Sequence, residues 1–386
     1  MRFLHTGDWH VGRSIRGRSR AEEFAAALEQ VVAIAKDEKV DAVLIAGDLY
    51  DQRSAAPEAD ELVFGTFVKL YEARIPVVLI PGNHDSPVRL AALAKLLGEI
   101  DIAVVPRVAP ADQGGSTEIP SRNGRETGLI VCVPFVPERR FGDAAALFDA
   151  TEKWYESYGE GMGKLIAALS ESFRGDRVNV LMAHLFTDGA MLGGGEREIT
   201  IGMSYAISPS RLPASANYIA LGHVHKPQQV KGAPATARYS GSLLQLDFGE
   251  TNQQKSVAIV EASPGKPAKV REIPLSAGRR LVDIRGPLDE IIARAGGLRD
   301  AYVRAFVQSK GPVPGIADRV REAIPNVLDV HLEYDRTEAE LPGAPVAAMS
   351  PREQFLAYYE THHGASADEE LLRAFDEVLE LETEGA

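Results

Sequence analysis

Five short motifs spread acidic, amide and imidazole side chains over the first 225 residues of this chain. They are Gly7-Asp8-Trp9-His10, Gly47-Asp48-Leu49-Tyr50-Asp51, Gly82-Asn83-His84-Asp85, His184 after Leu181-Met182-Ala183, and Gly222-His223-Val224-His225. Most of them directly follow an apolar run of the kind that forms a buried strand. Functional groups gather at the carboxyl ends of strands in α/β sheets, so the fold is expected to bring these strand ends together.

The apolar runs and the patterns between them predict an α/β fold. Strands are expected at residues 3–6, 42–46, 77–81, 129–133, 178–183 and 218–221. Residues 21–38 have the spacing of an amphipathic helix, with Phe24, Leu28 and Val31 on one face. This alternation of strands and helices favours a layered sheet. Further short strands, expected at 238–242, 257–260 and 270–274, would complete the same core.

The chain is long enough for more than one domain, because single hydrophobic cores stop growing at about 250–300 residues. The expected division of the 386 residues is a first domain at 1–278, a compact α+β unit at 279–335, a linker at 336–348 and terminal helices at 349–386. Ser350–Glu353 and Ser366–Glu369 have the sequence of capping boxes, so each is expected to begin one terminal helix.

The composition favours some classes of protein over others. The net charge of −13 argues against a broad basic surface, although a few local cations and bound metals could still contact nucleic acid. No apolar run approaches the roughly 20 residues of a membrane helix, and the N-terminus carries no secretory signal. Cys132, the one cysteine, is expected to be a small buried hydrophobe. These features favour a cytoplasmic protein without a membrane partner.

The residue types in the motifs suit two divalent cations held close together. The candidate ligands are oxygen and imidazole groups, namely Asp8, His10, Asp48, Asn83, His184, His223 and His225. Such ligands, without a thiolate, suit Mn²⁺, with Fe²⁺ or Zn²⁺ as competitors. Two cations of this kind clamp the attacking and leaving oxygens when a phosphate ester is hydrolysed. His84 could stabilise the developing charge or protonate the leaving oxygen.

Each motif alone has an ordinary structural explanation. A Gly-Asp pair such as Gly7-Asp8 is common in turns, and a single histidine such as His184 is more often structural than a ligand. The joint arrangement of the five motifs is what favours a metal centre. The remaining histidines are expected to be strand or surface residues without an evident role, and they are His5, His331, His362 and His363.

The motifs GDWH, GDLYD, GNHD, the histidine of MAH and GHVH resemble the five phosphoesterase motifs of the calcineurin-like metallophosphoesterases. The finer resemblance is to the SbcD family, the nuclease subunits of bacterial SbcCD complexes. It rests on MRFLHTGDWHVG, IPGNHDSPVRL, and ALGHVHKPQ followed by RYSGSLLQLDFGE, and covers about residues 1–250. The resemblance implies a layered core of two β-sheets flanked by helices, with a small α+β capping domain and a C-terminal helical pair.

The resemblance also implies a role for each site residue. One metal falls to Asp8, His10, Asp48 and His225, and the other to Asp48, Asn83, His184 and His223. His84 becomes the catalytic histidine. Archaeal and eukaryotic members carry a second histidine where this chain has Asp51. The catalytic role of Asp51 therefore stays open: it could orient a metal-bound water or His84, or cap the following helix.

Other segments of the chain point to partners. The arginines after the first motif could contact DNA phosphates or form a solvated loop, and they are Arg13, Arg16, Arg18 and Arg20. Helices expected at 58–73 and 87–97 carry more apolar residues than one core-facing stripe requires. The excess could be core, whereas the resemblance implies a homodimer. The terminal helices are expected to bind a partner groove, and the resemblance implies an SbcC-type ATPase as that partner.

Three functions compete on these features. The leading hypothesis is an Mn²⁺-dependent nuclease that processes DNA ends in recombination and repair together with an SbcC-type ATPase. Double-strand exonuclease and single-strand endonuclease activities are implied by the resemblance. The alternative is a metallophosphoesterase acting on small phosphodiesters or phosphoproteins. A non-catalytic binding module is disfavoured, because a scaffold need not retain both sets of ligands.

Overall fold

The computed structural model describes residues 1–142, 157–196, 205–311, 313–334, 350–363, 367–369 and 371–376. Its contacts divide the chain into two units. One consists of Met1–Val307 with Gly315–His331, and the other of Gln308–Pro314 with Leu332–Ala386. Within the described ranges, no helix combines the length and the apolar character that crossing a membrane requires.

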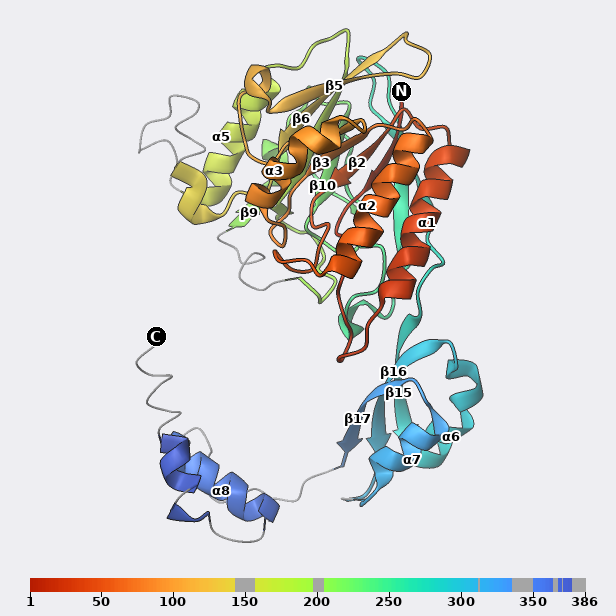
Figure 1. Ribbon diagram of the computed structural model, residues 1–386, viewed down its shortest axis with the longest axis vertical. Coiled ribbons are helices and arrows are strands. Elements are labelled where there is room, and N and C mark those ends of the chain that lie inside the picture. Colours follow the sequence, from red (N-terminus) through yellow and green to blue (C-terminus); the bar gives the residue numbers. More distant parts are fainter. Residues whose placement is uncertain are drawn as a thin grey trace. The chain divides into compact units, whose positions relative to one another are not determined.

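Two six-stranded sheets form the centre of the first unit (Figure 1). The first sheet has the order β14 (Lys269–Pro274), β13 (Ser256–Glu261), β1 (Arg2–Thr6), β2 (Ala42–Ala46), β3 (Val77–Ile80) and β4 (Ile102–Val104). The second has the order β11 (Gln228–Gln229), β12 (Ala237–Tyr239), β10 (Tyr218–Gly222), β7 (Val178–His184), β6 (Thr127–Val133) and β5 (Ser116–Pro120). The predicted strands are present, most with ends that differ by one or two residues.

The parallel strands decide where the site forms. β1, β2, β3 and β4 run parallel in the first sheet, and β6, β7, β10 and β12 run parallel in the second. Their carboxyl ends therefore lie along one edge of each sheet. The described antiparallel pairings involve strands toward the sheet edges, for example β13 against β1 and β5 against β6.

Alternation of side chains along the strands fills three hydrophobic layers. Between the sheets, Phe3 and Leu44 of the first pack against Ile130 and Met182 of the second, and Cys132 is buried among them as predicted. The other face of the first sheet packs on α1 (Ala21–Asp37), α2 (Pro57–Glu72) and α3 (Pro87–Gly98). The other face of the second packs on α5 (Tyr158–Ser170). The predicted layered α/β class is confirmed.

A smaller sheet follows the core in the sequence. It consists of β15 (Arg280–Pro287), β16 (Ala301–Gln308) and β17 (Val327–Glu333), accompanied by α6 (Leu288–Ala293) and α7 (Ile316–Ala323). Ile15 and Phe248 of the core pack with Leu281 and Tyr302 of this region in one buried cluster. The backbone N–H of Leu281 also donates to Gln245 Oε1 at 2.7 Å.

The second unit contains α8 (Pro351–His363). The predicted capping box at its start is present, since Ser350 Oγ accepts from the N–H of Glu353 and Glu353 Oε2 accepts from the N–H of Ser350. Phe355 stacks on Phe375 with 4.3 Å between ring centroids, which holds α8 against the helical residues 371–376. Ser366, of the second predicted capping box, and the linker at 336–348 lie outside the described residues.

Candidate metal centre

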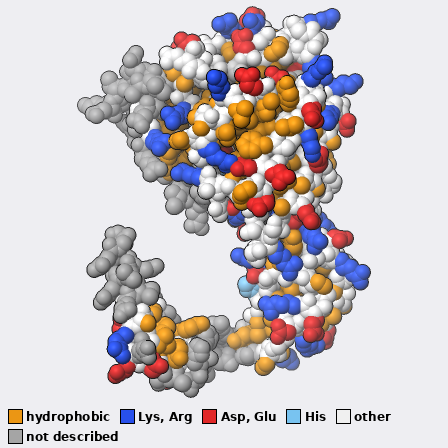
Figure 2. Space-filling model, in the orientation of Figure 1, with side chains coloured by type: hydrophobic (Ala, Val, Ile, Leu, Met, Phe, Trp, Pro, Cys, Tyr) orange, Lys and Arg blue, Asp and Glu red, His pale blue; other side chains and the backbone are white. Residues whose placement is uncertain are grey.

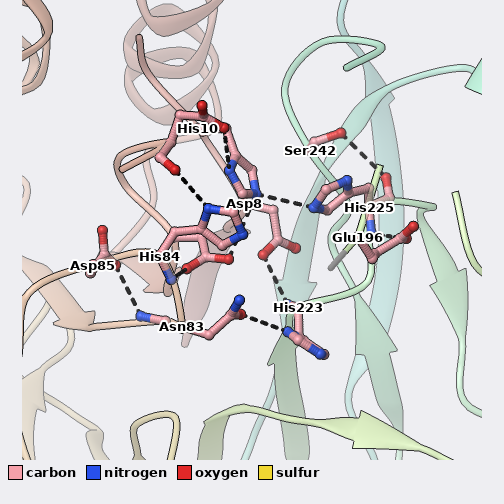
Figure 3. Close-up of polar contacts among 12 residues, drawn as sticks. Asp8, His10, Asn83, His84, Asp85, Glu196, His223, His225 and Ser242 are labelled. Atoms are coloured by element: carbon pink, nitrogen blue, oxygen red, sulfur yellow. Dashed lines mark hydrogen bonds and ion pairs between the residues drawn. The ribbon is translucent and has the colours of Figure 1, made fainter. Parts of the chain in front are cut away.

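All five motifs meet at the carboxyl edge of the two sheets. Asp8, Asp48 and Asn83 follow β1, β2 and β3, while His184 ends β7 and His223 follows β10. The first two loops are tied together, because the N–H of Asp8 donates to the carbonyl of Gly47 at 2.9 Å. Figure 3 shows side chains from both sheets turned toward one common space. The expectation that strand ends converge is thus fulfilled.

The backbone at this edge adopts conformations that L-residues rarely take. Four of the candidate ligands have a positive φ, namely Asp8 at 48°, His10 at 49°, Asp48 at 51° and His223 at 97°. Each such position costs on the order of 1–3 kcal/mol, which packing elsewhere has to offset. Gly47 has a φ of 93°, and a Cβ there would collide with Nδ1 of His184. The motif glycine is therefore required by the approach of the two sheets.

Asp48 lies between two groups of imidazoles. Its Oδ2 is 3.6 Å from Nε2 of His10 on one side and 3.4 Å from Nε2 of His184 on the other. Burial alone would raise the pKa of Asp48, but the histidines around it outweigh burial and hold that pKa well below its usual range. Asp48 is thus a buried anion with an imidazole on each side, which suits a carboxylate shared by two cations.

One group of donors lies around His225, and we call it the His225 end. Nε2 of His10 and Nε2 of His225 face each other at 3.0 Å. Oδ1 of Asp8 accepts from the N–H of His223 at 2.8 Å, but Oδ2 of Asp8 is buried without a hydrogen-bond partner among the described residues. Burial raises the pKa of Asp8 to about 6. A buried carboxylate oxygen without a donor is costly, and a bound cation would satisfy it.

The other group, the His184 end, is built around Asn83. Its Oδ1 is 3.0 Å from Nε2 of His184 and 2.9 Å from Nδ1 of His223. Nδ1 of His184 donates to the carbonyl of Ala46 at 2.8 Å, which leaves Nε2 directed at Asn83 and Asp48. Burial lowers the pKa of His184, yet the charges of Asp48 and Asp8 outweigh it and raise the pKa to about 9. A cation at this end would displace that proton.

These donors fit the divalent metals that the motifs predict. Among the described residues, two groups could each hold a cation, and Asp48 belongs to both: His10, Asp48 and His84 form one, and Asp48, His184 and His223 the other. The oxygen and imidazole donors, the orphaned Oδ2 of Asp8 and the facing nitrogens all suit a cation of intermediate hardness. The inclusion of His84 differs from the sequence-based assignment, in which His84 is catalytic.

His84 is held from the second motif. Its Nδ1 donates to the backbone carbonyl of Asp51 at 2.7 Å, and its N–H donates to Oδ1 of Asp48 at 2.8 Å. Its ring lies edge-on to that of His10, with 4.6 Å between centroids. Of the roles considered for Asp51, helix capping is wrong, because α2 begins at Pro57 with Ala56 at its N-cap.

The side chain of Asp51 has its own partners. Oδ1 of Asp51 is 3.1 Å from Nη1 of Arg13 and 3.6 Å from Nδ1 of His10. Burial opposes ionisation, but His10 and Arg13 outweigh it and lower the pKa of Asp51 to about 2. The carboxylate of Asp51 thus faces His10, while the backbone carbonyl of the same residue orients His84.

A buried charged network behind His225 escaped sequence analysis. Nδ1 of His225 is 3.2 Å from Oε1 of Glu250, and Oε2 of Glu250 is 2.7 Å from Nζ of Lys255. Lys255 also donates to the carbonyl of His225 at 2.8 Å, and Oε1 of Glu196 accepts from the N–H of His225 at 3.0 Å. Glu250 ends the stretch RYSGSLLQLDFGE, yet no local pattern indicates that it reaches back to His225.

Asp85 belongs to the third motif, but the sequence predicts no role for it. It is buried, and its carboxylate accepts from the N–H groups of Leu49, Tyr50 and Gly82 at 2.9–3.2 Å. Burial raises the pKa of Asp85 to about 7, with a further contribution from the charge of Asp48. Asp85 therefore joins the loops after β2 and β3 and fixes the position of Asp48 relative to Asn83.

The four arginines after the first motif are all engaged. Arg13 pairs with Asp51, Arg16 pairs with Asp329 at 2.6 Å, and Arg18 donates to the carbonyl of Pro325 at 3.3 Å. The last two contacts reach the region of the small sheet.

For Arg20, the prediction of a DNA contact is wrong. Arg20 is only 2% exposed, is paired with Glu23 at 2.8 Å, and donates to the carbonyl of Gln245. Its guanidinium carbon also lies 5.8 Å from the centroid of the Tyr302 ring. A guanidinium buried and satisfied in this way cannot reach a phosphate without unfolding its surroundings.

Comparison with known proteins agrees with this geometry. The Calcineurin-like phosphoesterase family matches residues 1–227, which contain all five motifs. The fold and the site thus define a metallophosphoesterase that uses divalent metal, an enzyme that hydrolyses phosphodiesters. A second family, the Type 5 capsule protein repressor C-terminal domain, matches residues 277–363.

The similarity to particular proteins extends over nearly the whole chain. A Bacillus subtilis (strain 168) protein, named as the D subunit of the nuclease SbcCD, is 31% identical over 390 residues, spanning 98% of this chain and 97% of the relative. A protein of the same name from Rhodobacter capsulatus is 31% identical, spanning 90% of this chain and 84% of the relative. That of Escherichia coli (strain K12) is 30% identical, spanning 78% and 74%. The chain belongs to the SbcD family, as its motifs predicted.

Proposed function

We propose that this protein is an Mn²⁺-dependent nuclease that processes DNA ends, with double-strand exonuclease and single-strand endonuclease activities. The observation that carries the proposal is the buried position of Asp48 between two groups of oxygen and nitrogen donors. The names of the relatives support a nuclease rather than a phosphatase. The protein would act in the cytoplasm, with DNA ends as its substrate.

We propose two sets of metal ligands that share Asp48. The His225 end would use Asp8, His10 and His225, and the His184 end would use Asn83, His184 and His223. Divalent cations held there would act as Lewis acids on the phosphate ester. Mn²⁺ suits these mixed ligands, because it accepts both carboxylate and imidazole and keeps positions open for water.

In this proposal, His84 transfers a proton. A carbonyl oxygen can only accept, so the Nδ1 that donates to Asp51 carries a hydrogen and the ring is fixed by that bond. Nε2 is then the nitrogen that can exchange a proton with the leaving oxygen. Asp51 would act as a positioning residue, with its carbonyl on His84 and its carboxylate on His10.

We propose that residues 279–335 form a capping domain that helps to select DNA, and that residues 349–386 dock an SbcC-type ATPase. Arg16 and Arg18 support the first idea, because their bonds tie the loop after the first motif to this region. Tyr358 of α8 is 58% exposed, which supports the second. Deletion of residues 349–386 should abolish co-purification with the ATPase and leave Mn²⁺-dependent cleavage intact.

A homodimer through α2 and α3 is also proposed. Figure 2 shows hydrophobic side chains gathered on the face above these two helices. The exposed members include Val68 and Tyr71 of α2, at 45% and 43%, and Leu96 of α3, at 67%. Exposed apolar side chains gathered on one face indicate a protein interface. Light scattering should find a dimer at micromolar concentration, and a strict monomer would contradict the proposal.

The central experiment compares two substrates in the presence of Mn²⁺. The full chain is incubated with end-labelled duplex DNA and, separately, with an aryl phosphodiester. Cleavage of the DNA supports the nuclease, whereas hydrolysis of the ester alone would favour the alternative function. His84→Ala should abolish cleavage of both while the metal content stays near normal. Loss of metal from His84→Ala would instead make His84 a ligand.

A further inference from the structure

A groove of about 730 Å³ opens beside the candidate metal centre. Asn83 lies at its wall, together with Gly82 and Asp85 of the same motif. Phe135, which follows β6, lines the groove as well. The ring of Phe135 stacks on His223 with 6.0 Å between centroids and an interplanar angle of 24°. A molecule lying in the groove would therefore reach the His184 end directly.

Much of the groove surface is apolar. Pro87 and Val88 at the start of α3 form one part of it, and Pro106, Pro134 and Phe135 contribute another. The ring of Phe135 also stacks on Tyr205, so the groove offers a base mainly the apolar contact of Phe135 and of the prolines. Apolar surfaces of this kind suit unpaired bases and sugars.

The charged groups of the groove are almost all cationic. Arg53, Arg107 and Arg140 line it and are exposed, and they come from three separate segments of the chain. Within the part of the chain that the structure describes, none of the three side chains has an ion pair or a hydrogen bond. The acidic lining residue, Asp85, is buried, and its carboxylate is occupied by backbone N–H groups.

The contrast with the arginines after the first motif is direct. Arg13, Arg16 and Arg20 have carboxylate partners, so a phosphate would have to displace an existing ion pair. Among the described residues, the three groove arginines have no such competitor. Guanidinium groups available in this way beside an apolar surface suit a flexible polyanion with exposed bases.

We propose that this groove binds an unpaired strand of DNA and leads it to the metal centre past Asn83. The proposal deepens the proposed nuclease function and rests on it. Arg53, Arg107 and Arg140 hold successive phosphates, while Phe135 and the prolines contact bases and sugars. A duplex would present only its phosphates here, because its bases are stacked on one another and cannot use the apolar surface.

The test measures binding of a fluorescent single strand of about 12 nucleotides, within the usual site size for such grooves, to the full chain without added Mn²⁺. The variant carries Arg53→Glu, Arg107→Glu and Arg140→Glu. Each lost phosphate contact lowers the slope of log affinity against log salt by about 0.7, so the slope should fall by about 2. The matched control carries Arg125→Glu, Arg174→Glu and Lys231→Glu, which change the net charge equally outside the groove.

The outcomes separate the groove from the nuclease. An unchanged slope in the groove variant, or an equal fall in the control, overturns the proposal. The groove variant is also tested with a blunt duplex. If its salt slope falls as much for the duplex as for the single strand, the assignment to an unpaired strand is overturned. A single strand containing 5-iododeoxyuridine should photo-crosslink to the peptide that contains Phe135. Crosslinks found only in peptides outside the groove would contradict the proposal. Wild-type protein that binds the strand in the groove but does not cleave DNA would refute the nuclease and leave the groove standing.

Discussion

The His184 end and the His225 end of the candidate metal centre are held by different kinds of chemistry. At the His184 end, Nδ1 of His184 is fixed by the backbone carbonyl of Ala46, and Asn83 is a neutral amide. At the His225 end, Nδ1 of His225 is fixed by Glu250, which is itself paired with the buried Lys255. The histidine that names one end is thus oriented by the backbone of the sheet, and the histidine that names the other end by a buried ion pair.

This difference predicts which end of the site can be weakened by substitution of a supporting side chain. A backbone carbonyl in a central strand does not titrate and cannot be removed by substitution. A buried ion pair is costly to desolvate, and removal of one partner leaves the other charge uncompensated. We therefore expect the His225 end to be the one that side-chain changes can disturb selectively, and the shared Asp48 to be the residue that couples the ends.

The largest effect is expected from Asp48→Asn, which should weaken metal binding at both ends together. The substitution removes the charge that both ends share and keeps an oxygen that can accept from the N–H of His84. Bound metal contributes several kcal/mol to phosphate-ester hydrolysis, so activity should fall by about 1,000-fold or more. Mass spectrometry of the metal content and hydrolysis of an aryl phosphodiester would measure this, and a variant that keeps both metals would contradict it.

Lys255→Met tests the ion pair as a stabilising feature. Burial alone would raise the pKa of Glu250, but Lys255 and His225 together outweigh burial and lower that pKa to about 2. Without Lys255, this buried carboxylate loses its lysine partner and keeps only His225 as a charged neighbour, so the free energy of unfolding should fall by about 3–5 kcal/mol. Urea unfolding of EDTA-treated protein measures the loss without a contribution from metal.

A double variant keeps that prediction falsifiable. Glu250→Gln combined with Lys255→Met removes both charges and should recover part of the lost stability. A double variant less stable than Lys255→Met would show that the charge of Glu250 is not the cause.

The candidate ligands could be predicted from the sequence because each follows a strand. Asp8, Asp48 and Asn83 come after β1, β2 and β3, and parallel strands place their carboxyl ends on one edge. The fold class followed from the same strands and from the apolar spacing of α1. Local pattern is sufficient where the position of a side chain is set by the strand that precedes it.

The supporting residues could not be predicted, because long-range packing decides their roles. Glu250 and Lys255 lie about 25 to 30 residues after His225, and no spacing rule connects them. Arg20 has the same side chain as Arg13 and belongs to the same segment, yet one is buried and the other is partly exposed. Charge in the sequence shows that an arginine needs a partner but does not show whether that partner is a carboxylate or a phosphate.

Glu250→Gln should weaken one end of the site only. The amide can still lie beside Nδ1 of His225, but it no longer supplies the charge that orients and polarises the ring. Loss of such an outer hydrogen-bond partner typically lowers metal affinity by about 10- to 100-fold. Titration with Mn²⁺ should therefore separate two binding steps, with the weaker one shifted. Glu72→Gln, a change at an exposed position of α2, is the control. Equal shifts of both Mn²⁺-binding steps in Glu250→Gln would contradict the proposed difference between the two ends.

The smallest effect concerns His5, a buried histidine of β1 that lies outside both ends. Its Nδ1 is 2.9 Å from the hydroxyl of Tyr218, and burial lowers its pKa from 6.5 to about 3. The unfolded chain therefore binds a proton at His5 below pH 6.5 that the folded chain rejects, and stability is lost as the pH falls from 6.5 toward 3. Above pH 6.5 both states are neutral and His5 contributes no pH dependence.

His5→Gln should remove this acid sensitivity. Between pH 7.5 and pH 5.5, the free energy of unfolding of the EDTA-treated wild type should fall by about 1.4 kcal/mol more than that of the variant. Groups elsewhere cancel in this difference, and His331→Gln, at an exposed histidine of β17, controls for the loss of one histidine. An equal pH dependence in wild type and His5→Gln would mean that β1 accommodates a charged imidazole. That result would weaken the view that His184 holds its proton because the charges of Asp48 and Asp8 outweigh burial.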